Sequence, residues 1–216
     1  ATIGGPRFTI GTRGGTGAFN VQSGAVLTID GTGVSGTTPG FFVGDGGTGS
    51  LIVDGPGSAV SMGGFTGSGY AAGGIIGWNS GTGSVTLRNQ ATLSLASPGA
   101  SFTSGGFDVD RAGGIGTFTL QTGATMTIDG TGTTGTITPG MALGREGGTG
   151  TLTVESGAAL TIKPNSNGGG ITVGWHAGGT GTMVVDGAGT QVLLDGTAPG
   201  ARPSMTVGSG AGSHGP

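Results

Sequence analysis

The stretch VGDGGTGSLIVDGPGSAV, residues 43–60, decides the fold because the chain repeats it, for example as VGWHAGGTGTMVVDGAGTQV at 173–192. The tripeptide GTG, or its variant GIG, recurs at intervals of 32, 34, 33, 34 and 31 residues, with its first glycine at Gly15, Gly47, Gly81, Gly114, Gly148 and Gly179. Such a period is typical of solenoids and propellers, whose units bury their apolar faces only against neighbouring units. Residues 1–216 are therefore predicted to form a single repeat array.

Each unit contains three short segments in which apolar and polar residues alternate, as in half-buried strands. The first segments begin at Phe8, Phe41, Phe107, Met141, Ile171 and Met205. The second begin at Ala18, Ser50, Ser84, Thr117, Thr151 and Thr182, and the third at Val26, Ala59, Thr92, Thr125, Ala159 and Gln191. In every second segment the alternate positions are apolar, for example Leu51 and Val53, and must point inward. Four-residue runs bounded by glycine disfavour helix.

Three strands per unit favour a parallel β-helix over a propeller. A propeller blade needs about four antiparallel strands, whereas in a β-helix each strand pairs with its equivalent about 4.8 Å away in the next coil. The handedness of parallel crossovers predicts a right-handed coil. We therefore expect an all-β, right-handed parallel β-helix of about six three-strand rungs. Glycines at the corners supply positive φ and close backbone approach.

The composition excludes several classes of partner. The formal net charge is −3 with only seven Lys and Arg, so no positive field attracts nucleic acid or an anionic membrane surface. No apolar stretch approaches the length of about 18 residues that a membrane span requires, and we expect no membrane insertion by this segment. The chain has no cysteine, which excludes disulfides and thiolate metal sites.

Both ends are expected to lie inside an open coil. Residues 1–3 resemble the tail of a third strand, and the segment from Met205 supplies a first strand with no second strand after it. Neither end carries a polar cap of the kind that shields solenoid edges from other chains. Two alternatives follow: a segment cut from a longer array, or a subunit that stacks end to end into a fibre. In either case the predicted partner is the same repeat.

The unit VG..GGTGTLTV..GA.LTI, best matched at 143–162 and 173–192, resembles the glycine-rich repeats of bacterial autotransporter (type V secretion) passenger domains. Similar repeats occur in proteins with a PEP-CTERM sorting tail. The resemblance covers the whole chain and implies a secreted, stalk-like β-helix displayed at the bacterial cell surface or outside the cell. Such passengers include adhesins, biofilm scaffolds and some enzymes, so the resemblance leaves the activity open.

A binding column is predicted at the turn after the first strand, where one residue per rung stacks on the next: Thr12, Asp45, Trp78, Arg111, Arg145 and Trp175. Trp78 and Trp175 could stack on sugar rings, and Arg111 and Arg145 could pair with uronic acids. The competing interpretation is that exposed turns tolerate any residue. Further contact candidates are Phe65, Tyr70 and Phe102, in the long third connections.

An enzymatic alternative rests on FDVDR, where Asp110 replaces the usual glycine and Asp108 lies outward on the strand two residues earlier. That separation, about 7 Å along a strand, suits an acid and base acting on a glycosidic bond. With Arg111 beside them, the site would be that of a polysaccharide lyase or hydrolase. The neighbouring outward positions, Ile75 and Ala142, are apolar, and the competing interpretation is a solvated strand end.

A second alternative is ice binding. Outward Thr-x-Thr pairs, which could order water, occur at Thr117 with Thr119, Thr125 with Thr127 and Thr151 with Thr153; Ile52, Val184 and Leu193 break the rows.

The Asp-Gly turns lack the spacing of calcium-binding coils, and we expect neither a metal nor a cofactor. The sequence therefore predicts a structural and adhesive protein without catalytic activity, whose partners are its own repeat and surface glycan.

Overall fold

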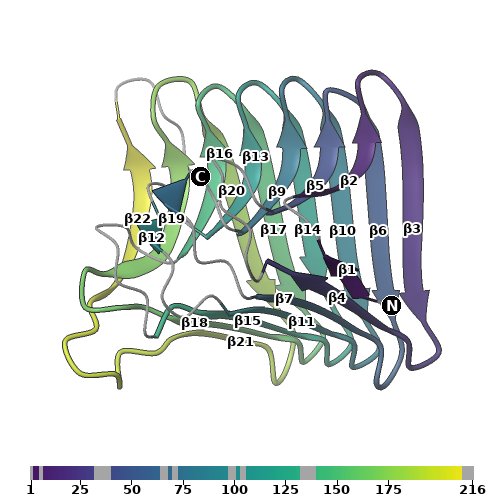
Figure 1. Cartoon of the computed structure of the whole chain (residues 1–216). Coiled ribbons are helices and arrows are strands. Elements are labelled where there is room, and N and C mark those ends of the chain that lie inside the picture. The colour runs from purple at the N-terminus through teal and green to yellow at the C-terminus, as the bar shows by residue number, and fades with distance from the viewer. Residues whose placement is uncertain are drawn as a thin grey trace.

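The computed structural model is an all-β solenoid (Figure 1) that describes residues 2–4, 7–31, 40–63, 68–69, 73–96, 101–102, 106–131 and 140–210. These residues form strands, turns and irregular segments and no helix. Among them, accordingly, no helix is long and apolar enough to cross a membrane. The all-β prediction is confirmed.

Most strands belong to three parallel sheets, named here for the three segments of the repeat. The first sheet contains β2 (Arg7–Thr12), β5 (Gly40–Asp45), β9 (Gly73–Trp78), β13 (Phe107–Arg111), β16 (Gly140–Arg145), β19 (Gly169–Trp175) and β22 (Pro203–Ser209). The second contains β3 (Thr16–Gln22), β6 (Thr48–Asp54), β10 (Thr82–Arg88), β14 (Ile115–Leu120), β17 (Thr149–Glu155) and β20 (Thr180–Asp186). The third contains β1 (Thr2–Gly4), β4 (Val26–Asp30), β7 (Ala59–Gly63), β11 (Thr92–Ala96), β15 (Thr125–Asp129), β18 (Ala159–Lys163) and β21 (Gln191–Leu194).

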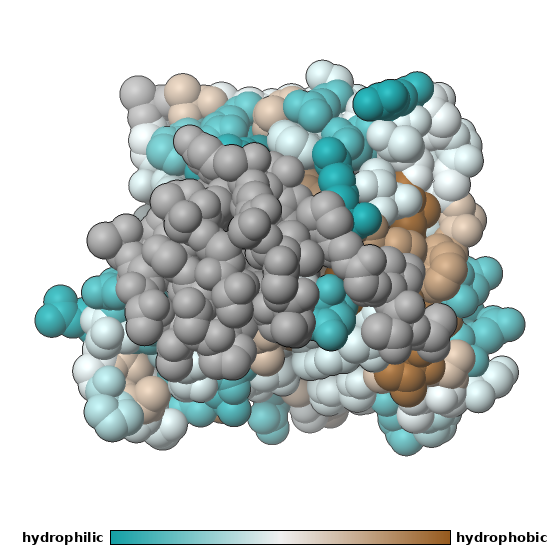
Figure 2. Space-filling view, viewed as in Figure 1, coloured by the Kyte–Doolittle hydropathy of each residue, from teal (hydrophilic) through white to brown (hydrophobic). Residues whose placement is uncertain are grey.

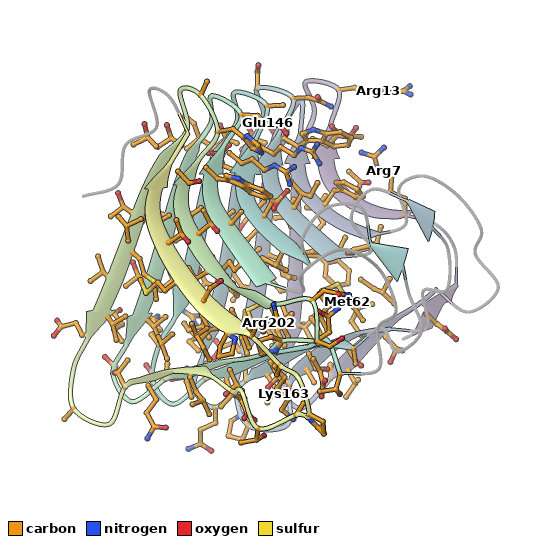
Figure 3. All side chains as sticks on the ribbon, turned by 90° about the vertical axis from the view of Figure 1, so that its left-hand side faces the viewer. Arg7, Arg13, Met62, Glu146, Lys163 and Arg202 are labelled. Atoms are coloured by element: carbon orange, nitrogen blue, oxygen red, sulfur yellow. The ribbon has the colours of Figure 1, made fainter. Side chains whose placement is uncertain are left out.

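Each strand pairs in parallel with the equivalent strand of the next coil, in a register that keeps equivalent positions stacked. We number the coils 1 to 6 by their second-sheet strands, from β3 to β20. Seen from the C-terminal end (Figure 3), the chain rises along the first sheet, descends along the second and returns along the third while approaching the viewer, which makes the coil right-handed. The predicted topology and hand are therefore confirmed.

One strand, β9, is not among the predicted first segments because glycine occupies its inward position. Gly74 stands where neighbouring coils have Phe41 and Phe107. A Cβ on Gly74 would lie 2.2 Å from the ring of Phe107, which fills the space that a larger side chain would need. The absence of an apolar residue in one coil is thus compensated by the next.

The core is a continuous column of apolar side chains inside the coil. Most residues predicted to point inward from the second segments are almost fully buried, among them Leu51, Phe118 and Leu152, each with 0% of its surface exposed. At the C-terminal end this burial stops: Val185 in coil 6 is 49% exposed, and Met205 and Val207 on β22, which follows coil 6, are 55% and 51% exposed. The strands β20, β21 and β22 each pair with a described strand along one edge only.

A bulge closes every first-sheet strand and turns the chain into the second sheet. At Gly44, for example, φ is +77° and the residue is skipped in the pairing register. A Cβ there would lie 2.2 Å from the carbonyl oxygen of Thr82 in the next coil. Only glycine combines this φ with such a close approach at low cost. The glycine periodicity therefore follows from the corner geometry.

The corner from the second to the third sheet has two forms. In coils 2 and 6 the turn is one residue longer, as DGPGS and DGAGT, and ends in Ser58 or Thr190 where other coils have alanine, such as Ala91. The Ser58 hydroxyl donates to the carbonyl oxygen of Asp54 at 2.7 Å and accepts from the Gly24 amide at 3.0 Å. Thr190 makes the equivalent pair of bonds. A buried hydroxyl thus satisfies backbone groups at the longer turn.

The third connections contain one further pair of strands, β8 (Ser68–Gly69) and β12 (Ser101–Phe102), which are parallel. The proposed contact residues Phe65 and Tyr70 lie outside the described residues. For Phe102 the structure describes only the backbone.

Candidate functional site

Six side chains stack at the corner that follows the first sheet, in the order Thr12, Asp45, Trp78, Arg111, Arg145 and Trp175. This set, the corner column, has the predicted order. Its members follow the bulge, which breaks the alternation of the strand. Their role in glycan binding remains a prediction. Hydrophilic patches alternate with neutral and weakly hydrophobic surface along the upper edge of the molecule (Figure 2).

Around Trp78 the column forms an aromatic and charged group. The rings of Phe42 and Trp78 stack with centroids 5.3 Å apart, and the Arg7 guanidinium lies 4.1 Å from the Phe42 centroid. Arg7 also pairs with Asp45, which accepts a 2.9 Å hydrogen bond from the Asn79 amide. The ring of Trp78 therefore stacks on Phe42 and also has the Arg7 guanidinium over it, 5.3 Å from its centroid.

Around Trp175 the column forms a second group of the same kind. The Arg145 guanidinium lies 4.2 Å from the centroid of a Trp175 ring. Its Nη1 is 3.4 Å from an oxygen of Asp108, and its Nε is 3.2 Å from an oxygen of Glu146. Arg111 donates from Nε to the other oxygen of Glu146 at 3.0 Å. Glu146, labelled at this corner in Figure 3, therefore bridges the two arginines of the column.

Sequence reasoning did not assign a role to five participants: Arg7, Phe42, Asn79, Glu146 and His176. Asn79 and Glu146 directly follow column residues, and so does His176, whose ring centroid is 4.6 Å from that of Trp175. The signal available for these three was therefore the second position of the turn. Phe42 lies three residues before a column residue, at the outward position that Asp108 has in its own coil, so this spacing was available for it. Arg7 is at the start of β2, and no repeated spacing relates it to the column.

Asp108 and Asp110 lie in β13 but differ from a solvated strand end. Asp108 does occupy the outward position predicted for it, in register with Ile75 and Ala142, yet only 1% of it is exposed. Asp110 is fully buried and has a φ of +80°, the value that its glycine equivalents adopt. Its carboxyl group occupies the space where a Cβ on Gly148 would lie, and within the described residues neither of its oxygens has a hydrogen-bond partner.

Burial controls the protonation of both carboxyl groups. It raises the pKa of Asp108 to about 6, although the charges of Arg145 and Arg111 oppose the rise. Burial raises the pKa of Asp110 further, to about 8, and the nearby charge of Asp108 adds to this rise. Partial burial would also raise the pKa of Glu146, but the hydrogen bond and charge of Arg111 and the charge of Arg145 hold it below its usual value. Glu146 is therefore ionised at neutral pH, where it pairs with both arginines.

Two hollows adjoin these elements. A cavity of about 90 Å³ on the outer side of the first sheet is lined by Ala142, Thr172, Ser204 and Trp175, among others. The other, of about 430 Å³, is the end of the core at coil 6 and is lined by apolar residues such as Met183, Val185 and Val207. Within the described residues, no three acidic, His or Cys side chains gather as a metal site would require.

These features define the class of the protein: a parallel β-solenoid repeat protein with a cluster of charged and aromatic side chains at the corner that follows the first sheet. Comparison with protein-family models, with curated proteins and with solved structures gave no match to this chain.

Proposed function

We propose that this chain is a structural and adhesive shaft, extracellular or on a bacterial cell surface, without catalytic activity. The observation that carries the proposal is the unbroken parallel pairing from coil to coil. Strands such as β10 and β14 are hydrogen-bonded along both edges, in register, by their own equivalents. Such a stack distributes load over many backbone hydrogen bonds and holds side chains at fixed positions along its length. The resemblance of the repeats to autotransporter passengers supports this location.

The same repeat is the first proposed partner. At the C-terminal end of the solenoid the inward side chains of Val185, Met205 and Val207 are about half exposed, and the outer edges of β20, β21 and β22 pair with no other described strand. Another coil of this type, in the same chain or in a second copy, would cover these side chains and pair with these edges.

Acidic surface glycan is the second proposed partner, bound at the corner column. The column combines Trp78 and Trp175 with Arg111 and Arg145, and uronic acids pair with guanidinium groups as Glu146 does. A bound uronate would therefore compete with Glu146 for the two arginines.

The test uses beads coated with the purified chain on surfaces of polygalacturonate or neutral dextran. We expect adhesion to polygalacturonate only, reduced by Arg111→Gln and increased by Glu146→Gln. The Thr127→Gln variant, on the outer side of the third sheet, serves as the control and should adhere as the wild type does. Equal adhesion to both surfaces, or none, would show that the glycan assignment is wrong. Electron microscopy of the same material tests the shaft, which should appear as straight rods.

A second candidate function is a β-helix polysaccharide lyase or hydrolase acting through Asp108, Asp110 and Arg111. The pKa values of about 6 and 8 favour it, because an acid and a base of different strength are what such chemistry requires. The burial of both carboxyl groups is against it, since a polysaccharide must reach them. Release of sugar products from polygalacturonate, abolished in Asp110→Gly, would support the enzyme; no product from the wild type would leave the shaft as the better proposal.

A further inference from the structure

The outer face of the second sheet carries hydroxyl groups in two regular columns. The first column contains Thr16, Thr48, Thr82, Ile115, Thr149 and Thr180, and the second contains Ala18, Ser50, Ser84, Thr117, Thr151 and Thr182. A third, shorter column has Thr86, Thr119 and Thr153 in its central coils. Two of the Thr-x-Thr pairs noted in the sequence, Thr117 with Thr119 and Thr151 with Thr153, lie in this array, whereas Thr125 with Thr127 lies on the third sheet.

The array is regular in two directions. Neighbouring strands pair residue for residue with no offset, so successive hydroxyl groups of a column lie about 4.8 Å apart. Alternate residues of one strand lie about 6.6 to 7 Å apart. The six strands run side by side across this face (Figure 1). Because threonine is branched at Cβ, its side chain has few rotamers, and the hydroxyl and methyl groups of a column can repeat in the same orientation.

The array is also free of charge. None of the three columns contains an acidic or basic residue, whereas the next outward position of the same strands is charged in most coils, as at Asp54, Arg88 and Glu155, and borders the array on the side of the third sheet. Side-chain hydrogen bonds of the described residues likewise gather at corners, as at Ser58 and Thr190, and none that the structure shows involves a hydroxyl of the array. These hydroxyl groups are therefore free to bind water.

We propose that the threonine face of the second sheet binds the surface of ice. Waters held by hydroxyl groups at two fixed repeats form an ordered layer, and the methyl groups between them limit other positions for these waters. An ice surface has no net charge and excludes ions, so a charge-free face is its electrostatic complement. This activity goes beyond the proposed shaft and does not depend on it.

The test measures two properties of the purified chain: the fraction taken up into slowly growing ice, and the gap between melting and freezing temperatures. We expect uptake above that of a non-binding globular protein, and a measurable gap. In the double variant Thr117→Tyr with Thr151→Tyr, bulky rings interrupt the second column in coils 4 and 5, and both signals should fall about tenfold or more. Tyrosine retains strand propensity, so the coil should still form.

The matched control is Ala159→Tyr with Gln191→Tyr, two paired outward residues of the third sheet in coils 5 and 6. This variant should keep the wild-type signals, with circular dichroism showing equal folding of all three proteins. If the double variant of the second sheet does not fold, Thr151→Lys replaces it, with Ala159→Lys as its control. Absence of ice uptake by the wild type, equal loss in both variants, or binding to crystalline cellulose without binding to ice would overturn the proposal.

Discussion

The corner column and the threonine face belong to the same coils and obey the same register, yet they differ in almost every chemical property. The column contains charges, aromatic rings and buried carboxyl groups that contact one another from coil to coil, as Arg145 does with Asp108 and Trp175. The threonine face has short uncharged side chains that repeat without such contacts. In the column, each side chain contacts side chains of the neighbouring coils, so a substitution alters those contacts. On the threonine face, the property of interest is the regular spacing of the hydroxyl groups. A solenoid can therefore carry specific and regular surfaces side by side.

The largest change in unfolding free energy is expected from Arg145→Met, in the corner column. Arg145 is buried and is the described cation nearest to the buried Asp108, so its removal leaves an unpaired carboxyl group in the interior. Breaking a buried pair in this way costs about 3 kcal/mol or more of unfolding free energy. On the threonine face, Thr151→Val should change stability by less than about 0.5 kcal/mol. Denaturant unfolding at neutral pH measures both; equal effects would remove the contrast between the two surfaces.

Asp110→Gly is expected to raise the unfolding free energy, by an amount intermediate between the other predicted changes. It restores the residue that other coils have at this positive φ and removes two buried oxygens without partners. Because the pKa of Asp110 rises from 3.8 to about 8, the folded state retains a proton between these values that the unfolded state has lost. The unfolding free energy of the wild type should therefore fall as pH rises through this range.

The Asp110→Gly variant lacks the carboxyl group that causes this fall. We therefore expect its unfolding free energy to exceed that of the wild type by roughly 1–3 kcal/mol, with the largest difference near pH 8. Unfolding at a series of pH values measures it. A variant with unchanged pH dependence would show that Asp110 is ionised in the folded protein, contrary to its burial.

The smallest effect is expected from Ser58→Ala, at the opposite border of the threonine face. The substitution removes a hydroxyl that bonds to two backbone groups, and should cost about 1 kcal/mol. Thr190→Ala is the parallel change in coil 6 and should behave alike. Amide hydrogen exchange at Gly24 should accelerate in the Ser58 variant. If exchange and stability are both unaltered, the hydroxyl does not hold this corner.

The sequence predicts most of the architecture because each position of a solenoid repeats with the period. The three sheets, the hand, the inward positions and the order of the corner column all follow from that periodicity. Contacts between coils do not. The filling of the Gly74 position by Phe107, the burial of Asp108 and the bridging role of Glu146 depend on side-chain directions and sizes in adjacent coils. These are three-dimensional properties that spacing along the chain does not encode.

The register without offset has one more consequence. Because a coil contacts only the coils before and after it, and presents the same backbone to both, a whole coil of about 33 residues can be added or removed without altering the pairing elsewhere. Each such change would lengthen or shorten the molecule by about 4.8 Å. The length of a protein built in this way can therefore change in uniform steps of one coil each.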